Sequence, residues 1–218
     1  MQNIDYDLRS VQEVRDLARL GQIATEKIAN YTEDQIDRII RNMVRVAEEN
    51  AVSLAQMAVE ETGFGKVADK TYKNHMASTL LYDAIKDMKT IAIKARNGIV
   101  FSPHPSAAKC TLKAATLMRD AAVEAGAPEN IIGCISMPSM PATDELMHSK
   151  EVKMIIATGG PGMVKASYSA GKPALGVGAG NSPAYIERTA NVQQAVTNII
   201  ASKTFDYGTI CASEQSII

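Results

Sequence analysis

The three cysteines of this chain occupy segments of different character. Cys110 falls on the inner side of a predicted helix and Cys134 within an apolar run, so both are predicted to be buried small hydrophobic residues. Cys211 instead follows the turn-forming sequence 206–208 (Asp-Tyr-Gly). A cysteine at the end of a loop, or at the start of a helix, can act as a nucleophile. On these grounds alone, Cys211 is either a catalytic thiol or an unreactive loop residue.

Two glycine-rich loops follow predicted strands, at residues 158–162 and 176–181. A glycine-rich turn between a strand and a helix lets the backbone approach a phosphate and directs a helix N-terminus at it. Neither loop matches the dinucleotide pattern G-x-G-x-x-G, because Asn181 and Lys165 stand where the third glycine would be, and no P-loop is present. Turn geometry alone explains the glycines, and phosphate binding is the alternative.

Among the three histidines, His104 has the most suggestive position. It lies in the sequence Ser-Pro-His-Pro directly after a predicted strand, where open α/β sheets bind ligands. His75 and His148 are predicted at the surface, and no pair has zinc spacing, so we expect no metal site. The adjacent carboxylates Glu60 and Glu61 are predicted to form a solvated helix face rather than an acid/base pair.

The elements that must position these residues divide into two regions. The first is helical, with Thr32 and Gln35 forming a capping box and an apolar stripe at Ile36, Ile39, Ile40, Met43, Val44 and Ala47. After residue 97, strands alternate with helices. Strands are predicted at 98–102, 131–135, 152–157, 173–177 and 183–187, and helices at 107–125, 144–148, 162–170 and 192–200. This alternation predicts an α/β fold with a parallel sheet flanked by helices.

Composition excludes several classes of function. Lys and Arg number 23 and Asp and Glu 24, so the net charge gives no reason to expect binding to nucleic acid or to an anionic membrane. No apolar run approaches the roughly 20 residues that span a bilayer. The first ten residues lack the pattern of a secretory signal, and three scattered cysteines suggest free thiols in a reducing compartment. We therefore expect a cytoplasmic protein.

Four segments together resemble the CoA-acylating aldehyde dehydrogenases, a group that includes the acetylating acetaldehyde dehydrogenases and the N-terminal half of bifunctional aldehyde–alcohol dehydrogenases. The segments are 60–70 (EETGFGKVADK), 95–110 (ARNGIVFSPHPSAAKC), 157–187 (beginning ATGGPGMVKASYSAGK) and 202–215 (SKTFDYGTICASEQ). The resemblance covers essentially the whole chain, in the same order. It implies an aldehyde dehydrogenase-like fold with a Rossmann-like parallel sheet flanked by helices, an N-terminal helical region and an oligomerisation arm.

The resemblance also implies roles for individual residues. Cys211 matches the nucleophile, with NAD as cofactor and coenzyme A as co-substrate. The residues that match cofactor-binding loops are Ser102, Pro103, His104, Thr158, Gly159, Gly160 and Gly178. Hydrolytic members of the superfamily carry a glutamate base in the block that matches residues 177–180, and this chain has none. The resemblance therefore favours acyl transfer to CoA over hydrolysis.

Two departures from the family pattern affect the expected domains. Residues 1–187 match the N-terminal helices plus the NAD-binding domain, and residues 188–218 match the start of a catalytic domain that stops soon after the nucleophile. Near positions 90/91 the family has a further segment with strands and an oxyanion-hole asparagine. Either these parts are deleted or the sequence given omits them. The alternative function is accordingly a catalytically inactive, nucleotide-binding remnant.

The expected substrate is a small aldehyde, with acetaldehyde first and propanal, butanal or succinate semialdehyde as alternatives, and we expect a homo-oligomer. Ser102 replaces a lysine that contacts the adenosine ribose in many family members, and the next basic residue, Lys109, lies seven positions on. A 2′-phosphate would gain from a nearby cation. We therefore expect NAD to be preferred over NADP, with modest discrimination.

Overall fold

The computed structural model describes residues 5–85 and 92–218. The α-helices are α1 (Tyr6–Ile28), α2 (Glu33–Glu49), α3 (Ala51–Thr62), α4 (Val67–His75), α5 (Leu81–Ile85), α6 (Ala108–Glu124), α7 (Met140–His148), α8 (Pro161–Ser169) and α9 (Val192–Thr204). The π-helix η1 (Met76–Leu80) and the 3₁₀ segments η2 (Ala92–Ala95), η3 (Pro105–Ala107) and η4 (Phe205–Gly208) join them. The strands are β1 (Ile99–Phe101), β2 (Ile132–Cys134), β3 (Ile155–Thr158), β4 (Ala174–Val177), β5 (Ser182–Ala184) and β6 (Glu214–Ile217).

The N-terminal helices form as their sequence predicts. Thr32 and Gln35 complete the predicted capping box at the start of α2, since the Thr32 hydroxyl accepts from the Gln35 N–H and the Gln35 side chain accepts from the Thr32 N–H. Ile36 and Ile39 of the predicted stripe are buried and contribute to a core that also includes Ile28 and Ile131. Helices α2 and α6 pack against each other, while α1 packs on α7.

The strands form three separate parallel pairs. β1 pairs with β2, β3 with β4, and β5 with β6. The predicted parallel direction of the strands is therefore confirmed, but within the described residues they form three two-stranded sheets rather than one continuous sheet. Alternating apolar segments identify strands, but they do not specify which strand edges meet. The segment near 90/91, where the family has further strands, lies outside the described residues.

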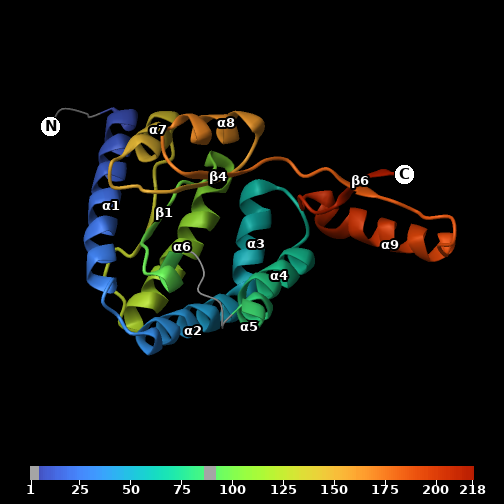
Figure 1. The fold of residues 1–218 in the computed structure, drawn as a ribbon, viewed down its shortest axis with the longest axis horizontal. Coiled ribbons are helices and arrows are strands. Elements are labelled where there is room, and N and C mark those ends of the chain that lie inside the picture. Colours follow the sequence, from blue (N-terminus) through green and yellow to red (C-terminus); the bar gives the residue numbers. More distant parts are fainter. Residues whose placement is uncertain (1–4, 86–91) are drawn as a thin grey trace.

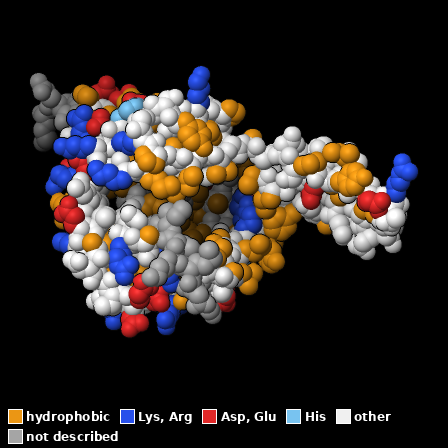
Figure 2. All heavy atoms as spheres, in the orientation of Figure 1, with side chains coloured by type: hydrophobic (Ala, Val, Ile, Leu, Met, Phe, Trp, Pro, Cys, Tyr) orange, Lys and Arg blue, Asp and Glu red, His pale blue; other side chains and the backbone are white. Residues whose placement is uncertain are grey.

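The narrow sheets leave apolar side chains uncovered. Parallel strands are normally buried on both faces, yet Phe101, Ile156, Leu175 and Val177 are all exposed, by 38% to 52%. Figure 2 shows a hollow near the centre of the drawn face, with apolar side chains around it. The small sheets thus have faces and edges that further chain could cover.

The segment from β5 to β6 extends away from the other elements as an arm (Figure 1). β5 precedes the predicted domain boundary at residue 187 and β6 follows it, yet hydrogen bonds pair the two strands. The predicted apolar face of α9 is largely exposed, including Val192, Val196 and Ile200. Unlike α2, this helix therefore finds no core to pack on within the described residues.

Most predicted boundaries agree with the structure to within two or three residues. The exceptions are the predicted helix at 144–148, which begins at Met140, and the predicted helix at 192–200, which continues to Thr204. Ser139 accepts a hydrogen bond from the Ala142 N–H and so caps α7 several residues earlier than expected. In the part of the chain that the structure describes, no helix combines the length and apolarity needed to cross a bilayer.

Candidate active site

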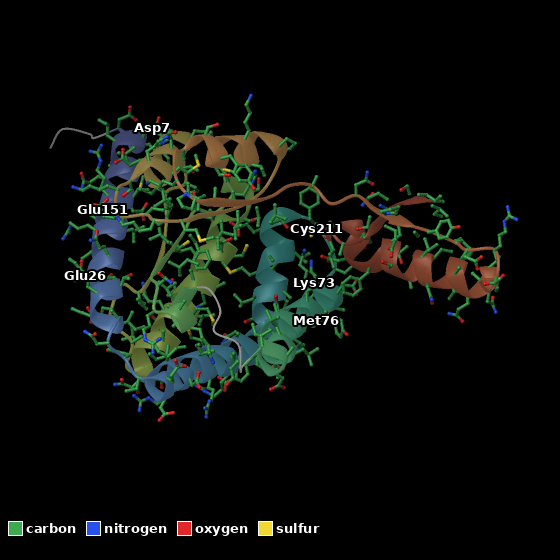
Figure 3. The ribbon with its side chains drawn as sticks, viewed as in Figure 1. Asp7, Glu26, Lys73, Met76, Glu151 and Cys211 are labelled. Atoms are coloured by element: carbon green, nitrogen blue, oxygen red, sulfur yellow. The ribbon has the colours of Figure 1, made fainter. Side chains whose placement is uncertain are left out.

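Cys211 lies in the turn that joins η4 to β6, and its side chain is exposed. Figure 3 places it where the arm meets the body, far from Asp7, Glu26 and Glu151. No helix begins at this position, so the possible helix start predicted for Cys211 is wrong and the loop interpretation is correct. Within the described residues the Cys211 N–H makes no hydrogen bond.

Gly180 brings the second glycine-rich loop against the turn that carries Cys211. A Cβ at position 180 would overlap the carbonyl group of Cys211. A larger residue there would therefore displace one of the two loops. Gly178, the predicted cofactor-binding residue of the same loop, has open space where its Cβ would be. Sequence reasoning singled out the loop but not Gly180, whose contact partner lies 31 positions away.

The first glycine-rich loop is a strand-to-helix turn, as predicted. Thr158 ends β3, Gly159 follows it, and Gly160 is the N-cap residue of α8. All three residues are exposed, and Cβ positions at Gly160 and Gly162 meet no atom within 4 Å. The nine-residue helix α8 therefore presents an accessible N-terminus, which favours an anionic group.

The third predicted loop follows β1. Ser102 and His104 are exposed while Pro103 between them is buried. The Ser102 hydroxyl lies 3.0 Å from that of Thr143, and His104 Nδ1 accepts from the Ser106 N–H at 3.2 Å. Within the described residues no hydrogen bond connects this loop to Thr158 or Cys211. The 176–181 loop therefore contacts Cys211 and also the 158–160 loop, since the Gly159 N–H donates to the Val177 carbonyl at 3.2 Å, whereas the 102–104 loop follows a different parallel pair.

Glu61 departs from the sequence prediction. Its carboxylate accepts the Lys109 N–H at 2.8 Å and the Cys110 N–H at 2.6 Å, and so caps the N-terminus of α6, which the 102–104 loop and η3 precede. Glu60 is exposed, as predicted. Burial raises the pKa of the Glu61 carboxyl, but the two backbone donors outweigh burial and the pKa is lowered. The sequence carried no signal of this contact between α3 and α6.

The other two cysteines are half-buried. Burial raises the pKa of the Cys110 thiol, and the neighbouring Glu61 carboxylate adds to the effect. Burial, with a contribution from Glu13, raises the pKa of Cys134 to about 11. Both environments disfavour the thiolate, so the exposed Cys211 is the strongest candidate for a reactive thiol.

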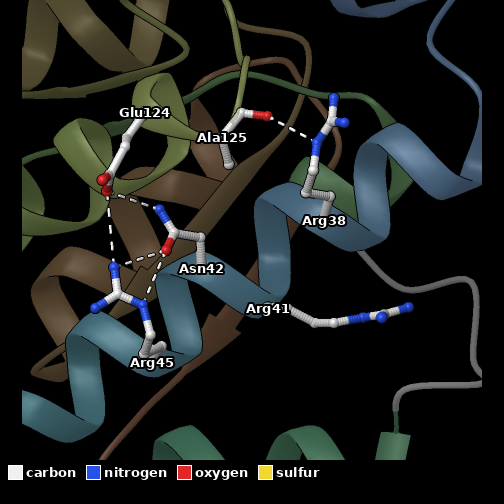
Figure 4. A pocket seen from close by; sticks show the side chains of 6 residues that line it. All are labelled: Arg38, Arg41, Asn42, Arg45, Glu124 and Ala125. Atoms are coloured by element: carbon white, nitrogen blue, oxygen red, sulfur yellow. Dashed lines mark hydrogen bonds and ion pairs between the residues drawn. The ribbon is translucent and has the colours of Figure 1, made fainter.

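A surface hollow between α2 and α6 lies apart from all these residues (Figure 4). There Arg38 Nε donates to the Ala125 carbonyl at 3.2 Å and Arg45 lies 3.7 Å from Glu124, while Figure 4 shows Arg41 pointing away from the others. Arg38 and Arg45 thus link α2 to the C-terminal end of α6 and contact no predicted site residue. Across residues 5–85 and 92–218, no group of three His, Cys, Asp or Glu side chains is arranged to hold a metal ion.

Comparison with known proteins identifies the class. The sequence model described as "Aldehyde dehydrogenase family" matches residues 84–218, which include the strand pairs, both glycine-rich loops and Cys211. This chain belongs to the aldehyde dehydrogenase family, and the resemblance found in its sequence is confirmed.

Within that family the similar proteins include acetylating enzymes. The chain is 42% identical to a bifunctional aldehyde-alcohol dehydrogenase of Escherichia coli, over 96% of this chain and 28% of that protein. It is 49% identical to an acetylating aldehyde dehydrogenase of Geobacillus thermoglucosidasius, with a TM-score of 0.94, over 98% of this chain and 56% of that one. A Rhodopseudomonas palustris propionaldehyde dehydrogenase, whose structure holds CoA and an acylated cysteine, is 27% identical with a TM-score of 0.85, over 94% of this chain and 55% of that one.

These comparisons confirm the aldehyde dehydrogenase-like fold class and show how much of its relatives the chain represents. The chain spans about a quarter of the first relative and just over half of each of the other two. The alignment with the E. coli enzyme extends over 249 positions, more than the 218 residues present here. That enzyme therefore has residues within the aligned region that have no counterpart in this chain.

Proposed function

We propose that this chain carries the cofactor-binding and nucleophile-bearing part of a CoA-acylating aldehyde dehydrogenase, which oxidises a short aldehyde to its acyl-CoA with NAD as oxidant. The observation that carries the proposal is the exposed Cys211, held in a turn against Gly180 of a loop that follows β4. Ligands bind at the C-terminal ends of parallel strands in α/β proteins. Cys211 is therefore beside the kind of loop where a cofactor and a substrate can meet.

The proposed chemistry is carried by the Cys211 thiolate. Its sulfur adds to the aldehyde carbon to form a thiohemiacetal, and the backbone N–H of Cys211 donates to the developing oxyanion. NAD, when bound, supplies the hydride acceptor that oxidises this adduct to a thioester. The sulfur of CoA then attacks the thioester carbonyl, the S–C bond to Cys211 breaks, and the thiolate is regenerated.

The residues present fit a dinucleotide. Gly160 and Gly162 leave the N-terminus of α8 open for a diphosphate, with Thr158 and Gly159 completing the turn. Ser102 and His104 offer exposed hydrogen-bonding groups for a ribose. Lys109 is exposed, but the Glu61 carboxylate lies at the same helix end. The negative charge of Glu61 opposes binding of the 2′-phosphate that distinguishes NADP from NAD. These features support NAD over NADP.

Three further expectations belong to this proposal. Acetaldehyde is the first substrate, with propanal, butanal and succinate semialdehyde as alternatives. The protein acts in the cytoplasm as a homo-oligomer, with apolar residues of the arm and of the small sheets covered in the assembly or by further chain. The cofactor domain ends near residue 187 and the catalytic domain begins there. β5, before this boundary, pairs with β6, after it, so the two proposed domains share one strand pair.

The proposal is tested by acylating the protein in the reverse direction. Wild-type protein incubated with acetyl-CoA should gain one acetyl group, located at Cys211 by peptide mapping, and should produce NADH from acetaldehyde, CoA and NAD. Cys211→Ser should abolish both signals, while the matched variant Cys134→Ser should retain them. Acylation of another residue, or NADH production that survives Cys211→Ser, contradicts the assignment.

The alternative function, a nucleotide-binding remnant without catalysis, has its own support. The 249-position alignment shows that the E. coli relative contains residues that this chain lacks. The intact mass of the purified protein separates the two cases, because 23.4 kDa corresponds to the chain without any further segment. NAD binding by a 23.4 kDa protein that makes no NADH and accepts no acetyl group would establish the remnant.

A further inference from the structure

A buried carboxylate lies five residues before Cys211. Asp206 is fully buried, with an exposed fraction of 0%, although it lies in the short 3₁₀ segment η4. Aspartate is rarely buried to this extent unless it is paired. The surrounding helix α4 and its preceding loop supply the partners, so Asp206 joins the nucleophile-bearing segment to a region some 140 positions earlier in the chain.

Every donor around Asp206 can be identified. The Lys66 N–H donates to Oδ1 at 2.7 Å, while Oδ2 accepts from Lys70 Nζ at 3.1 Å, from Thr209 Oγ1 at 2.9 Å and from Lys73 Nζ. The Asp206 N–H in turn donates to Asp69 Oδ2 at 2.7 Å. Burial opposes ionisation, but these donors hold the pKa of the Asp206 carboxyl well below its usual range. The carboxylate therefore lies between the ammonium groups of Lys70 and Lys73.

The backbone at this point needs such an anchor. Asp206 and Tyr207 have φ values of 49° and 56°, and Gly208 follows with 68°. Consecutive left-handed residues with a Cβ are unfavourable and persist only where the surroundings hold them. The chain also makes room for the carboxylate, because a Cβ at Gly65 would overlap Asp206 Oδ1. The unusual turn and its buried anchor are thus parts of one arrangement.

We propose that Asp206 is a positioning residue, which fixes the left-handed turn 206–208 on α4 and thereby sets where Cys211 stands beside Gly180. This inference rests on the proposed function of Cys211. Asp206 has no surface to offer a substrate, so it acts only through the backbone. The hydroxyl of Thr209 completes the link, since its oxygen lies 2.9 Å from both the carbonyl and the carboxylate of Asp206 and its one hydrogen is shared between these two acceptors.

Two variants and one matched control test the inference. Asp206→Asn keeps the size but removes the charge, and Thr209→Val removes one hydroxyl with little change in shape. Thr204→Val is the control, because the Thr204 hydroxyl donates only to the Ile200 carbonyl within α9. We expect kcat for acetaldehyde to fall about a hundredfold in Asp206→Asn, the loss that a misplacement of about 1 Å produces, and by less in Thr209→Val. Thr204→Val should leave kcat unchanged.

Two readouts separate positioning from a loss of folding. The rate at which iodoacetamide alkylates Cys211 should stay within about threefold of wild type, because an exposed thiol needs no precise placement to react with a small reagent. Amide hydrogen exchange in residues 207–213 should accelerate in both variants while exchange in α2 and α6 is unchanged. A fall in kcat that only tracks the folded fraction, or unaltered kcat and exchange in the two variants, would overturn the inference. If Asp206→Asn does not fold, Thr209→Val decides.

Failure of the proposed function gives a different result. Wild-type protein would then make no NADH and no acyl-enzyme, whatever residue 206 is. In that case hydrogen exchange alone tests whether Asp206 and Thr209 hold the turn 206–208 in place. Faster exchange at 207–213 in Thr209→Val than in Thr204→Val supports it, and equal exchange refutes it.

Discussion

The cap that Glu61 provides for α6 gives the sharpest stability prediction. Its carboxylate accepts two N–H groups of the first helical turn, which have no partner within the helix. Replacing Glu61 with Gln keeps an acceptor of the same length but removes the negative charge from the positive end of the helix dipole. Replacing it with Ala removes the acceptor as well.

The magnitude follows from these contacts. Loss of charge at a partly exposed helix N-terminus costs about 1 kcal/mol, and loss of the charge together with both hydrogen bonds costs about 2 kcal/mol, with solvent screening included. For a chain of this size each kcal/mol lowers Tm by about 2–4 °C. We therefore expect Glu61→Gln to melt about 3 °C below wild type and Glu61→Ala about 6 °C below it.

The effect should depend on pH in a defined direction. The pKa of Glu61 is lower in the folded state than in the unfolded state, so its charge stabilises the fold above the unfolded pKa of about 4.3. This contribution is lost as the pH falls through the folded pKa. The difference in Tm between wild type and Glu61→Gln should thus be constant near neutral pH and shrink below about pH 4.

Thermal melts of wild type, Glu61→Gln and the matched control Glu60→Gln provide the assay. Glu60 is the exposed neighbour on the same helix, and its replacement should change Tm by less than about 1 °C. Equal melting temperatures for the two Gln variants at neutral pH would refute the capping argument. A difference that persists undiminished in acid would refute its electrostatic part.

Four other predictions are direct. Limiting iodoacetamide should label Cys211 first, because a thiol with a pKa of about 11, such as Cys134, carries about a hundredfold less thiolate than an ordinary one; earlier labelling of Cys134 in peptide maps would contradict this. Thr32→Ala should lower the free energy of unfolding by about 1 kcal/mol through loss of the capping box, and Thr32→Ser should restore most of it in denaturant titrations. The protein should self-associate through the exposed apolar face of α9 and the unpaired strand edges, and light scattering that shows a monomer at all concentrations would count against it. NAD should bind more tightly than NADP in calorimetric titrations, and Ser102→Lys should reduce the difference between the two dissociation constants. Tighter binding of NADP by the wild type would show that the loop after β1 is misinterpreted.

The sequence by itself determined the local elements and the family. The capping box at Thr32, the stripe through Ile36 and Ile39, and the strand before each glycine-rich loop depend on residues close together in the chain, so their pattern suffices to predict them. The motif around Cys211 is likewise local. It identified the family before any geometry was known.

Tertiary structure alone decided how the pieces support one another. The cap of α6 by Glu61, the anchor between Asp206 and the lysines of α4, and the contact of Gly180 with Cys211 each join segments that are far apart in sequence. So does the division of the strands into three pairs. A carboxylate in a sequence shows only that it can accept hydrogen bonds. Which donors it meets depends on the path of the chain. Burial among those donors turns Asp206, an ordinary turn residue by sequence, into a tie between α4 and the segment that carries Cys211.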